Sequence, residues 1–429
     1  MTESDRMAAG LAVSVSYPCL MSKRVIVIGA GLAGLRAAGL LQEAGRDVVV
    51  LDAADAPGGR VRTDMVDGFR LDRGFQVLVT EYPEVKAALD LAALDLNPFE
   101  PGAKIFRRGH FHTLADPWRK PWEGARSFFG KPGNMVDRVR LASFRSKIVA
   151  STEAQLNEAT GMSFMESLRL HGFSAHFIDA FFRPWFGGIT LDSSLLSDAA
   201  FCKFVFRCLS VGDASVPSLG MGAVADQLAA RLKPGSLRLN LRVATIHGSQ
   251  VRLESGEIME SDTIVVATDG GESARLLQIP DPGSKCVTCV WFSAPKAPVE
   301  GAWLVLNGEA DGLINNVAVM TNVAPSYSSD ARALISATAL GNVVPKSDTI
   351  LKDDVMVQMR RWFGAEVDQW RVVRIDRIPH AQPFSTKSPR LVRPGLYVAG
   401  DHTQQASAHG ALRSGRVAAE AILAASTAA

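Results

Sequence analysis

The chain has 429 residues, which exceeds the usual size of one compact core and predicts two domains. Hydrophobic residues make up 47% and charged residues 21% of the chain, close to the globular average, which argues against a disordered or fibrous protein. The 46 lysines and arginines nearly balance the 44 acidic residues, and a net charge of +2 creates no field that would attract nucleic acid. We therefore expect no nucleic-acid partner.

Residues 1–22 are weakly apolar and have Arg6 as their one basic side chain, a poor pattern for a signal peptide. We expect a disordered extension here, with Met21 as an alternative start. The chain contains no uninterrupted run of 18 apolar residues, so no membrane-spanning helix is expected. A cytoplasmic protein fits these observations, and attachment to a membrane surface stays open as an alternative.

A βαβ unit follows. Val25 to Ile28 is an apolar, β-branched run typical of a strand buried on both faces of a parallel sheet. Leu32 to Ala44 has small and apolar residues at helical spacing and stops before Gly45. Asp47 to Leu51 reads as the second strand. The unit predicts a Rossmann-like α/β domain with a parallel sheet.

The turn after the first strand carries Gly29, Gly31 and Gly34 in the pattern GxGxxG. The first glycine permits a tight turn, the second lets the backbone approach a pyrophosphate, and the third lets the helix pack close to the sheet. The phosphate would lie at the helix N-terminus, where free N–H groups favour an anion. Asp52 ends the second strand, where a carboxylate can accept the ribose hydroxyls of an adenosine. A surface turn acid is the alternative reading of Asp52.

The run APGGRVRT favours FAD over NAD. Gly58 and Gly59 beside an arginine suit a second loop lying along a pyrophosphate. We expect Arg60 at the phosphate and Arg62 near the flavin or in a structural ion pair. A solvated basic turn is the alternative.

The middle of the chain is richer in aromatic residues and has helical periodicity. Helices are predicted over Pro132–Ala159, Ser163–His171, Ser174–Phe181, Ser197–Leu209 and Gly220–Leu232. Strands are predicted over Arg238–Ile246, Gln250–Glu254 and Thr263–Ala267, with a tight turn at Ser255-Gly256. Further on, we expect strands at Cys289–Phe292 and Leu334–Ala339 and a helix at Asp353–Phe363.

The cysteines are odd in number and too sparse for a disulfide framework, which favours a reducing compartment. They are Cys19, Cys202, Cys208, Cys286 and Cys289. The last two form a CxxC, but no second pair completes a metal site. We predict a strand-buried pair and no metal, with redox or metal chemistry as the alternative.

The closing segment GLYVAGDHTQQASAHGALRSGRVAAEAI repeats the order strand, turn, helix. We expect the strand over Gly395–Ala399 and the helix over Ala411–Ala425. Asp401 at the strand end could bind a ribityl hydroxyl, and N–H groups at the helix start could face the flavin pyrimidine. Ser414 and Gly415 suit close packing of this helix.

Together these elements predict a discontinuous architecture. Residues 23–93, 211–282 and 384–429 would form the FAD-binding domain, and residues 94–210 and 283–383 an α+β substrate domain.

Five segments carry a family resemblance: VIVIGAGLAGL, LDAADAPGGRVRT, the strand around Val243, DTIVVAT and the closing segment. In these segments the chain resembles the flavin-containing amine oxidase superfamily. Within it the chain looks like the branch of protoporphyrinogen oxidases and phytoene desaturases. The resemblance implies that Val243 contacts the adenine, Asp52 the ribose, and Asp401 the ribityl chain or pyrophosphate. Expected FAD contacts are Gly29, Ala30, Gly31, Ala33, Gly34, Asp52, Ala53, Gly58, Gly59, Arg60, Val243, Ala267, Gly400, Asp401, Gly410 and Ala411.

The sequence also departs from the superfamily. Amine oxidases usually have a lysine near flavin N5 on the strand that resembles CVTCVWF, where the nearest register here offers Trp291. Some members attach the flavin through a cysteine just before the final helix. Residues 405–408 contain none, so the FAD should be noncovalent.

We therefore expect an FAD-dependent oxidoreductase that dehydrogenates an extended apolar or conjugated substrate, carotenoid-like or tetrapyrrole-like, with flavin N5 as the hydride acceptor. No triad, paired-carboxylate or zinc pattern indicates a catalytic side chain, and the candidate polar groups His171, His176, His380 and His402 are more simply structural. An amine oxidase and a non-redox lipid- or prenyl-binding protein, as in the related GDP-dissociation inhibitors, are the alternatives. The sequence leaves the oligomeric state open.

The substrate pocket is expected to involve Trp185, Phe186, Met221 and Trp291. The other aromatic residues of the middle region suit either this pocket or the core. They are Phe181, Phe182, Phe201, Phe204 and Phe206.

Overall fold

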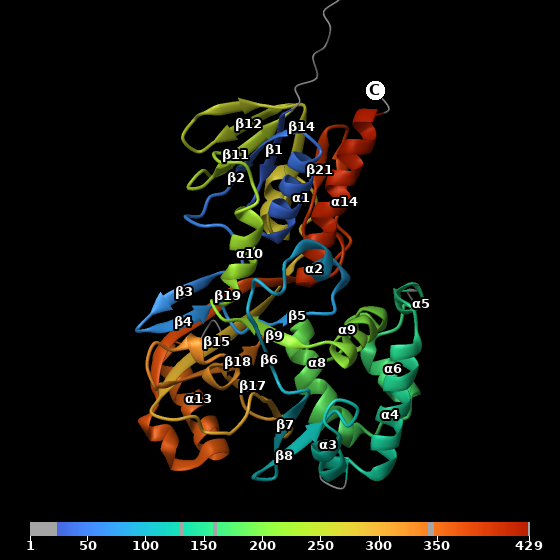
Figure 1. The fold of residues 1–429 in the computed structure, drawn as a ribbon, viewed down its shortest axis with the longest axis vertical. Coiled ribbons are helices and arrows are strands. Elements are labelled where there is room, and N and C mark those ends of the chain that lie inside the picture. Colours follow the sequence, from blue (N-terminus) through green and yellow to red (C-terminus); the bar gives the residue numbers. More distant parts are fainter. Residues whose placement is uncertain (1–23, 129–132, 158–160, 342–346, 428–429) are drawn as a thin grey trace, which may run out of the picture.

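The computed structural model describes residues 24–128, 133–157, 161–341 and 347–427. The predicted N-terminal extension, with its alternative start at Met21 and its cysteine Cys19, lies outside the described residues. The described chain forms two lobes, drawn above and below one another in Figure 1.

The upper lobe is built on a six-stranded sheet with the order β10-β2-β1-β14-β21-β20. Neighbouring strands are parallel except for the edge pair of β20 and β21, which is antiparallel. The predicted parallel Rossmann-like sheet is thereby confirmed, and it is assembled from distant parts of the chain. Its strands are β1 (Arg24–Ile28), β2 (Asp47–Leu51), β10 (Leu237–Arg238), β14 (Thr263–Val266), β20 (Leu391–Arg393) and β21 (Leu396–Val398).

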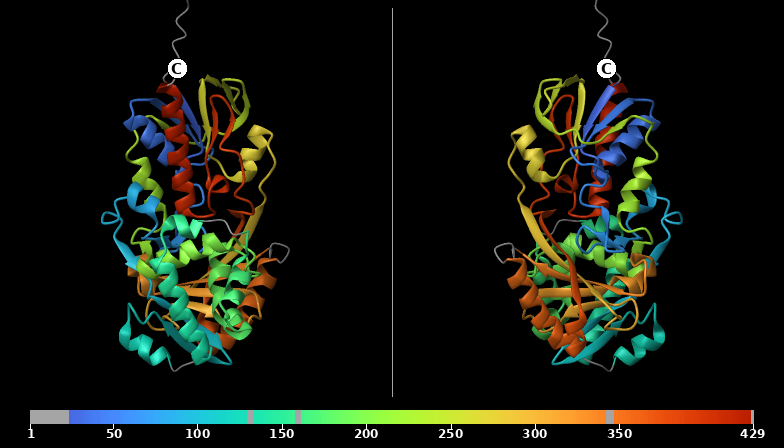
Figure 2. Two further views of the ribbon diagram at one scale, coloured as in Figure 1. Left: turned by 90° about the vertical axis from the view of Figure 1, so that its right-hand side faces the viewer. Right: turned by 90° about the vertical axis from the view of Figure 1, so that its left-hand side faces the viewer.

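Strand β1 is buried on both faces, as its unbroken apolar run predicts. Val25 and Val27 belong to the core that includes helices α1 (Leu32–Glu43) and α14 (Ala408–Thr427). Ile26 and Ile28 share a second core with the small antiparallel sheet of β11 (Val243–His247), β12 (Gln250–Leu253) and β13 (Ile258–Glu260). Figure 2 shows the sheet between these two layers.

Helices α1 and α14 touch at the predicted small residue. A Cβ atom on Gly415 would lie 2.2 Å from the carbonyl oxygen of Ala33, so any larger residue would separate the helices. The close packing expected of Gly415 is confirmed.

The lower lobe contains a seven-stranded sheet with the order β19-β15-β18-β17-β16-β7-β8. All neighbours are antiparallel except β16 and β7, which run parallel. Alternate residues of the central strand face two cores: Val290 and Phe292 pack with helix α13 (Asp348–Phe363), and Cys289 and Trp291 with the aromatic helices. The strands are β7 (Gly102–Arg107), β8 (His110–Ala115), β15 (Ser284–Ala294), β16 (Leu304–Asn307), β17 (Ile314–Val319), β18 (Ala333–Leu340) and β19 (Arg371–Pro383).

The remaining elements belong to one lobe or join the two. The helices of the lower lobe before β9 are α3 (Pro121–Phe128), α4 (Met135–Ala150), α5 (Glu153–Asn157), α6 (Phe164–Leu170), α7 (Ala175–Phe177), η1 (Ile178–Phe182, a π-helix), α8 (Arg183–Thr190) and α9 (Ala199–Val211). Of these, α3, η1 and α8 contact the sheet, and α4, α5 and α6 pack on α9. The other elements are β3 (Thr63–Val66), β4 (Phe69–Asp72), β5 (Leu78–Val79), α2 (Pro83–Ala88), β6 (Leu96–Pro98), β9 (Ala214–Pro217), α10 (Gly222–Ala229), α11 (Gly270–Leu277), α12 (Met320–Val323), η2 (Pro325–Tyr327), η3 (Gly364–Gln369) and η4 (Asp401–Thr403).

Several predicted elements have different bounds. The helix expected over Pro132–Ala159 is two helices, because α4 ends at Ala150 and the Thr152 hydroxyl starts α5 by accepting from the backbone N–H of Gln155. The strand expected over Arg238–Ile246 is broken where Asn240 adopts a φ of 58°. The Ser255-Gly256 turn joins β12 to β13, and β13 was not predicted. Strands β6, β7 and β8 were also missed in a region that we expected to be helical.

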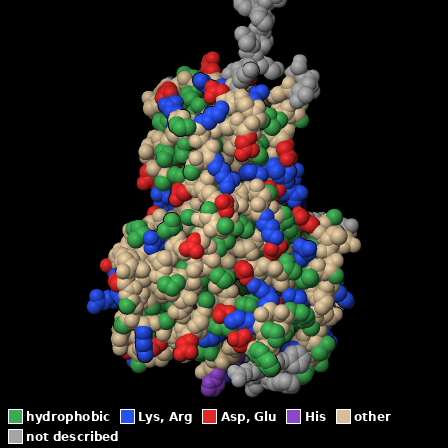
Figure 3. Space-filling view, viewed as in Figure 1, with side chains coloured by type: hydrophobic (Ala, Val, Ile, Leu, Met, Phe, Trp, Pro, Cys, Tyr) green, Lys and Arg blue, Asp and Glu red, His purple; other side chains and the backbone are tan. Residues whose placement is uncertain are grey.

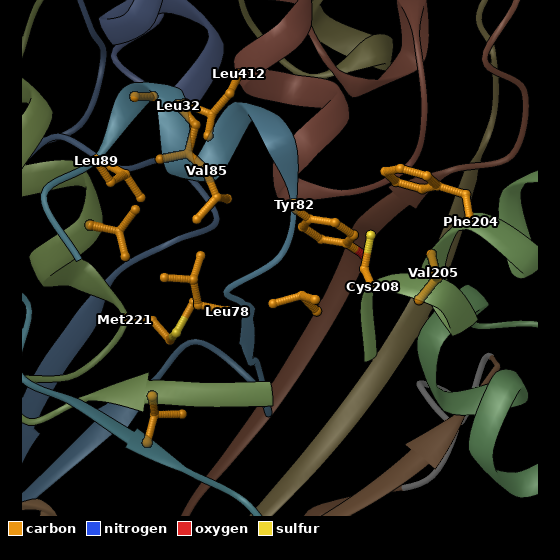
Figure 4. Packing of buried hydrophobic residues seen from close by; sticks show 14 of the residues in the cluster. Leu32, Leu78, Tyr82, Val85, Leu89, Phe204, Val205, Cys208, Met221 and Leu412 are labelled. Carbon is orange, nitrogen blue, oxygen red and sulfur yellow. The ribbon is translucent and has the colours of Figure 1, made fainter. Parts of the chain in front are cut away.

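One hydrophobic core runs through both lobes. Figure 4 shows Leu32 and Leu412 of the upper lobe packed around helix α2 and continuing to Phe204 and Met221 below. On the surface, Figure 3 shows basic and acidic side chains interspersed over one face of the molecule, which agrees with the near-zero net charge.

Candidate flavin site

The first glycine turn is closed on two sides and open on a third. Gly29 has a φ of 106°, and a Cβ there would lie 2.7 Å from the carbonyl oxygen of Ala267. A Cβ on Gly34 would lie 1.9 Å from the oxygen of Gly29. In contrast, a Cβ on Gly31 would have no heavy atom within 4 Å. The turn therefore presents open space at Gly31 at the N-terminus of α1, where an anion is favoured.

The acid at the end of β2 is held in a fixed orientation. One oxygen of Asp52 accepts from the backbone N–H of Ala30 at 2.6 Å, and the other accepts from Ala54 at 2.8 Å. Ala53 is exposed beside it. The carboxylate thus orders the turn, and its contact with a ribose stays a prediction.

The second glycine pair lies against the first turn. The N–H of Gly58 donates to the carbonyl oxygen of Ala30 at 2.8 Å. A Cβ on Gly59 would lie 3.7 Å from the Cα of Gly31, and Gly59 is exposed. The two glycine segments thus lie in contact, with Gly59 exposed and Gly31 partly exposed. Backbone N–H groups at such positions are the donors that a dinucleotide diphosphate requires.

The two arginines after this pair have different partners. Arg60 donates to the carboxylate of Asp401 at 2.8 Å and to the carbonyl oxygen of Ala381 in β19 at 2.8 Å. Arg62 forms an ion pair with Asp55 at 2.7 Å. This ion pair is one of the two roles that we expected for Arg62. Arg60 brings the opening segment of the chain into contact with its closing segment and with the lower lobe.

The closing turn is rigid and tightly packed. Gly400 has a φ of 145°, and its N–H donates to the hydroxyl of Ser414 at 2.7 Å. Asp401 is buried beside it. A Cβ on Gly410 would lie 1.9 Å from the oxygen of Gln405, and Ala411 follows in the first turn of α14. All these residues lie at the carboxyl end of the sheet, where open α/β sheets bind ligands.

An arginine that the sequence did not single out occupies the Val243 end of this region. Arg275 in α11 donates to the carbonyl oxygen of Val243 at 3.0 Å and pairs with Glu272 at 2.6 Å. The same end holds a pocket of about 350 Å³ lined by Arg242, Asp269, Gly271, Glu272, Arg275 and His380. The pairing of Arg275 with Glu272 three residues earlier in one helix is the signal that could have indicated it.

A buried acid behind the site was also missed. Asp72 at the end of β4 accepts from the Thr63 hydroxyl at 2.5 Å, from the N–H of Met221 at 2.9 Å and from the Tyr327 hydroxyl at 2.8 Å. Burial raises the pKa of Asp72 to about 6, against the opposing effect of these donors. The Thr63 hydroxyl in turn accepts from the N–H of Gly222 at 2.8 Å. Asp72 therefore fixes the turn that starts α10.

Two buried histidines flank the start of α14. Neither ring nitrogen of His402 has a hydrogen-bond partner among the described residues, and burial lowers its pKa. His409 accepts from the N–H of Glu84 at 3.3 Å and lies between Tyr82 and Phe204, with ring centroids 5.5 and 5.1 Å away. Burial lowers the pKa of His409 to about 4, so both rings are neutral at pH 7.

The residues predicted to line a substrate pocket lie mostly in the core. Phe186 and Trp291 are fully buried, Met221 is 2% exposed, and Trp185 is partly exposed. The indole N–H of Trp291 donates to Asp376 at 2.8 Å. Their role toward a substrate stays a prediction.

Among the described residues, no cluster of three His, Cys, Asp or Glu side chains could hold a metal ion, and no helix is long and apolar enough to cross a membrane. Cys286 and Cys289 both lie in strand β15, but only Cys289 is buried. Cys286 is partly exposed, so the predicted buried pair is correct for one of the two residues. Burial raises the pKa of the Cys289 thiol, which makes it a poor nucleophile.

Known proteins share this fold and these segments. The chain is 40% identical over 96 residues to hydroxyneurosporene desaturase of Rubrivivax gelatinosus, covering 21% of this chain and 18% of that protein. It is 43% identical over 159 residues to putrescine oxidase of Kocuria rosea, covering 35% and 32%. The matched segments thus span less than a third of each relative. An oxidoreductase from Methanosarcina mazei has a similar fold, with a TM-score of 0.71 at 16% identity over 92% of this chain and 100% of that one.

The family comparison covers most of the molecule, including the pair of Gly58 and Gly59 and the closing turn, and it begins at Leu32 within the first glycine motif. Residues 32–423 match the model of a family described as flavin containing amine oxidoreductase. The chain belongs to the flavin containing amine oxidoreductase family.

Proposed function

We propose that the chain binds FAD noncovalently between its first glycine turn and its closing turn and uses it to dehydrogenate a hydrophobic or conjugated small molecule. The observation that carries the proposal is the open space at Gly31 beside Gly59, in a segment that the ion pair of Arg60 with Asp401 joins to the closing turn. Bound FAD would supply a two-electron acceptor able to take a hydride. We assign FAD to residues 23–93, 211–282 and 384–429, and the substrate to 94–210 and 283–383.

Each part of the proposed site has a chemical task. The N-terminus of α1 at Gly31 would donate N–H groups to the diphosphate, and the oriented carboxylate of Asp52 would accept from the ribose. Arg60 keeps further N–H donors beyond those used for Asp401 and Ala381, and these can bind a phosphate oxygen. The buried Asp401 could then accept a ribityl hydroxyl.

Two observations favour dehydrogenation of an apolar substrate over amine oxidation. The strand position where amine oxidases of the superfamily usually have a lysine offers Trp291, whose indole N–H donates to Asp376 and which has no nitrogen that can accept a proton. The relative that the chain matches from Rubrivivax is a desaturase. The match to putrescine oxidase supports amine oxidation as the second candidate.

Purified protein is expected to be yellow, with flavin released by acid or heat. Anaerobic mixing with a panel of polyenes, porphyrinogens and amines should bleach the flavin band with a polyene or porphyrinogen. Bleaching by amines alone would reverse the ranking of the two enzymes. A colourless, folded protein that binds no added FAD would contradict both and favour a lipid- or prenyl-binding protein.

The closing turn can be tested with a matched pair of acids. Asp401→Ala should weaken FAD binding by about 10- to 100-fold, because a hydrogen bond to a charged group contributes about 1.5–3 kcal/mol. Asp269→Ala removes a helix cap that accepts from the N–H of Glu272 at 3.1 Å and should change FAD binding much less. Fluorescence titration of the apoprotein measures both. Equal losses would count against the assignment of Asp401.

A further inference from the structure

Four helices of the lower lobe enclose a second pocket. Helices α4, α5 and α6 all pack on α9, and they lie together at one edge of the lobe in Figure 1. The pocket between them has a volume of about 230 Å³. At about 30 Å³ per water molecule, this space would take about eight groups of that size, so a small ligand could fill it with one end in solvent. None of its lining residues belongs to the proposed flavin site.

The rim of this pocket is cationic and rich in hydrogen-bond donors. Lys147 in α4 and Lys203 in α9 both line it, and neither ammonium group has an ion-pair partner among the described residues. The side-chain oxygen of Gln155 accepts from the N–H of Thr152 at 2.8 Å, which leaves its amide N–H groups for a ligand. One ring nitrogen of His171 is bound to the oxygen of Ser167 at 2.7 Å, and the other is left for the pocket.

The floor of the pocket is apolar. It includes Ile148 and Leu156, which are 4% and 6% exposed and contribute to the main core. A cationic rim above an apolar floor suits a molecule with an anionic head and a short apolar body, because each part then meets the surface that stabilises it.

We propose that this lysine pocket, lined by Lys147, Ile148, Gln155, Leu156, His171 and Lys203, binds a small amphiphilic anion. Its carboxylate or phosphate would pair with the two lysines, and its apolar body would lie on Ile148 and Leu156. The proposal does not depend on the function proposed for the flavin site.

Calorimetric titration of the full-length, FAD-loaded protein with octanoate and, separately, with inorganic phosphate tests the pocket. We expect saturable binding of octanoate that the double variant Lys147→Gln/Lys203→Gln weakens at least tenfold. The double variant Lys233→Gln/Lys352→Gln, which removes the same charge at exposed positions outside the pocket, should bind like the parent. Ala200→Leu, which reduces the space in the pocket, should weaken octanoate but not change the flavin spectrum.

Three results would overturn the proposal. The first is that the folded protein does not bind octanoate saturably. The second is that the two double variants bind octanoate equally. The third is that the protein binds inorganic phosphate but not octanoate. The last would mean that the apolar floor contributes nothing. Octanoate bound in the proposed substrate site instead would be insensitive to the pocket variants and would appear as equal binding.

Discussion

Replacing Gly31 with valine is expected to weaken FAD binding by at least about 100-fold, equivalent to about 2.7 kcal/mol, while leaving the protein folded. A Cβ at this position meets no atom of the protein within 4 Å, and the backbone is extended with a φ of −75°. The added methyl groups would instead fill the space through which the diphosphate reaches the N-terminus of α1. Fluorescence titration measures the affinity, and thermal unfolding of the apoprotein checks the fold.

Two neighbouring glycines provide the controls. Gly39 lies in the same helix, and a Cβ there would have no heavy atom within 4 Å. Gly39→Ala should therefore leave FAD binding unchanged and stabilise the helix by up to about 1 kcal/mol. Gly34→Ala would place its Cβ 1.9 Å from a backbone oxygen and should destabilise the apoprotein itself. Normal FAD affinity in Gly31→Val would show that the cofactor does not approach this turn.

We expect the buried side chains of Asp72 and His409 to make the free energy of unfolding depend on pH in opposite directions. The pKa of Asp72 is about 6 in the folded protein and 3.8 ordinarily, so the free energy of unfolding falls by about 3 kcal/mol as the pH rises from about 4 to 6. The pKa of His409 is about 4 when folded and 6.5 ordinarily, so its contribution rises by about 3 kcal/mol as the pH rises from about 4 to 6.5. In the parent protein the two contributions largely cancel.

Single variants should separate these contributions. Asp72→Asn removes the contribution that falls with pH, so its free energy of unfolding relative to the parent should rise between pH of about 4 and 6. His409→Gln leaves the acid, so its value should fall with pH relative to the parent. Urea unfolding at several pH values gives the difference curves, in which titration shared with the rest of the chain cancels. Curves that stay parallel to the parent would show that these groups do not titrate as inferred.

The sequence was informative where neighbouring residues determine the structure. The run before Gly29 and the glycine spacing predicted the first strand, turn and helix, and the same order predicted the closing segment. The missed hairpin of β7 and β8 turns at Arg108 and Gly109, both with positive φ. Such a turn usually carries Asn or Asp before the glycine, so an arginine there concealed the signal.

Contacts between distant segments could not be predicted in this way. Asp72 acquires its role only where β4 meets Met221 and Tyr327, which lie 149 and 255 residues further along the chain. The pairing of Arg60 with Asp401 joins residues 341 positions apart, and no local pattern specifies it. Trp291 lay on a predicted strand, but its burial depends on the helices that cover that face of the sheet.

The core shared by the two lobes limits how the molecule can move. Because Leu32 and Leu412 are packed continuously with Tyr82, Phe204 and Met221, swinging one lobe away from the other would expose this apolar surface to water. A clamshell opening is therefore costly. A substrate would have to enter by rotation of side chains or displacement of short surface segments.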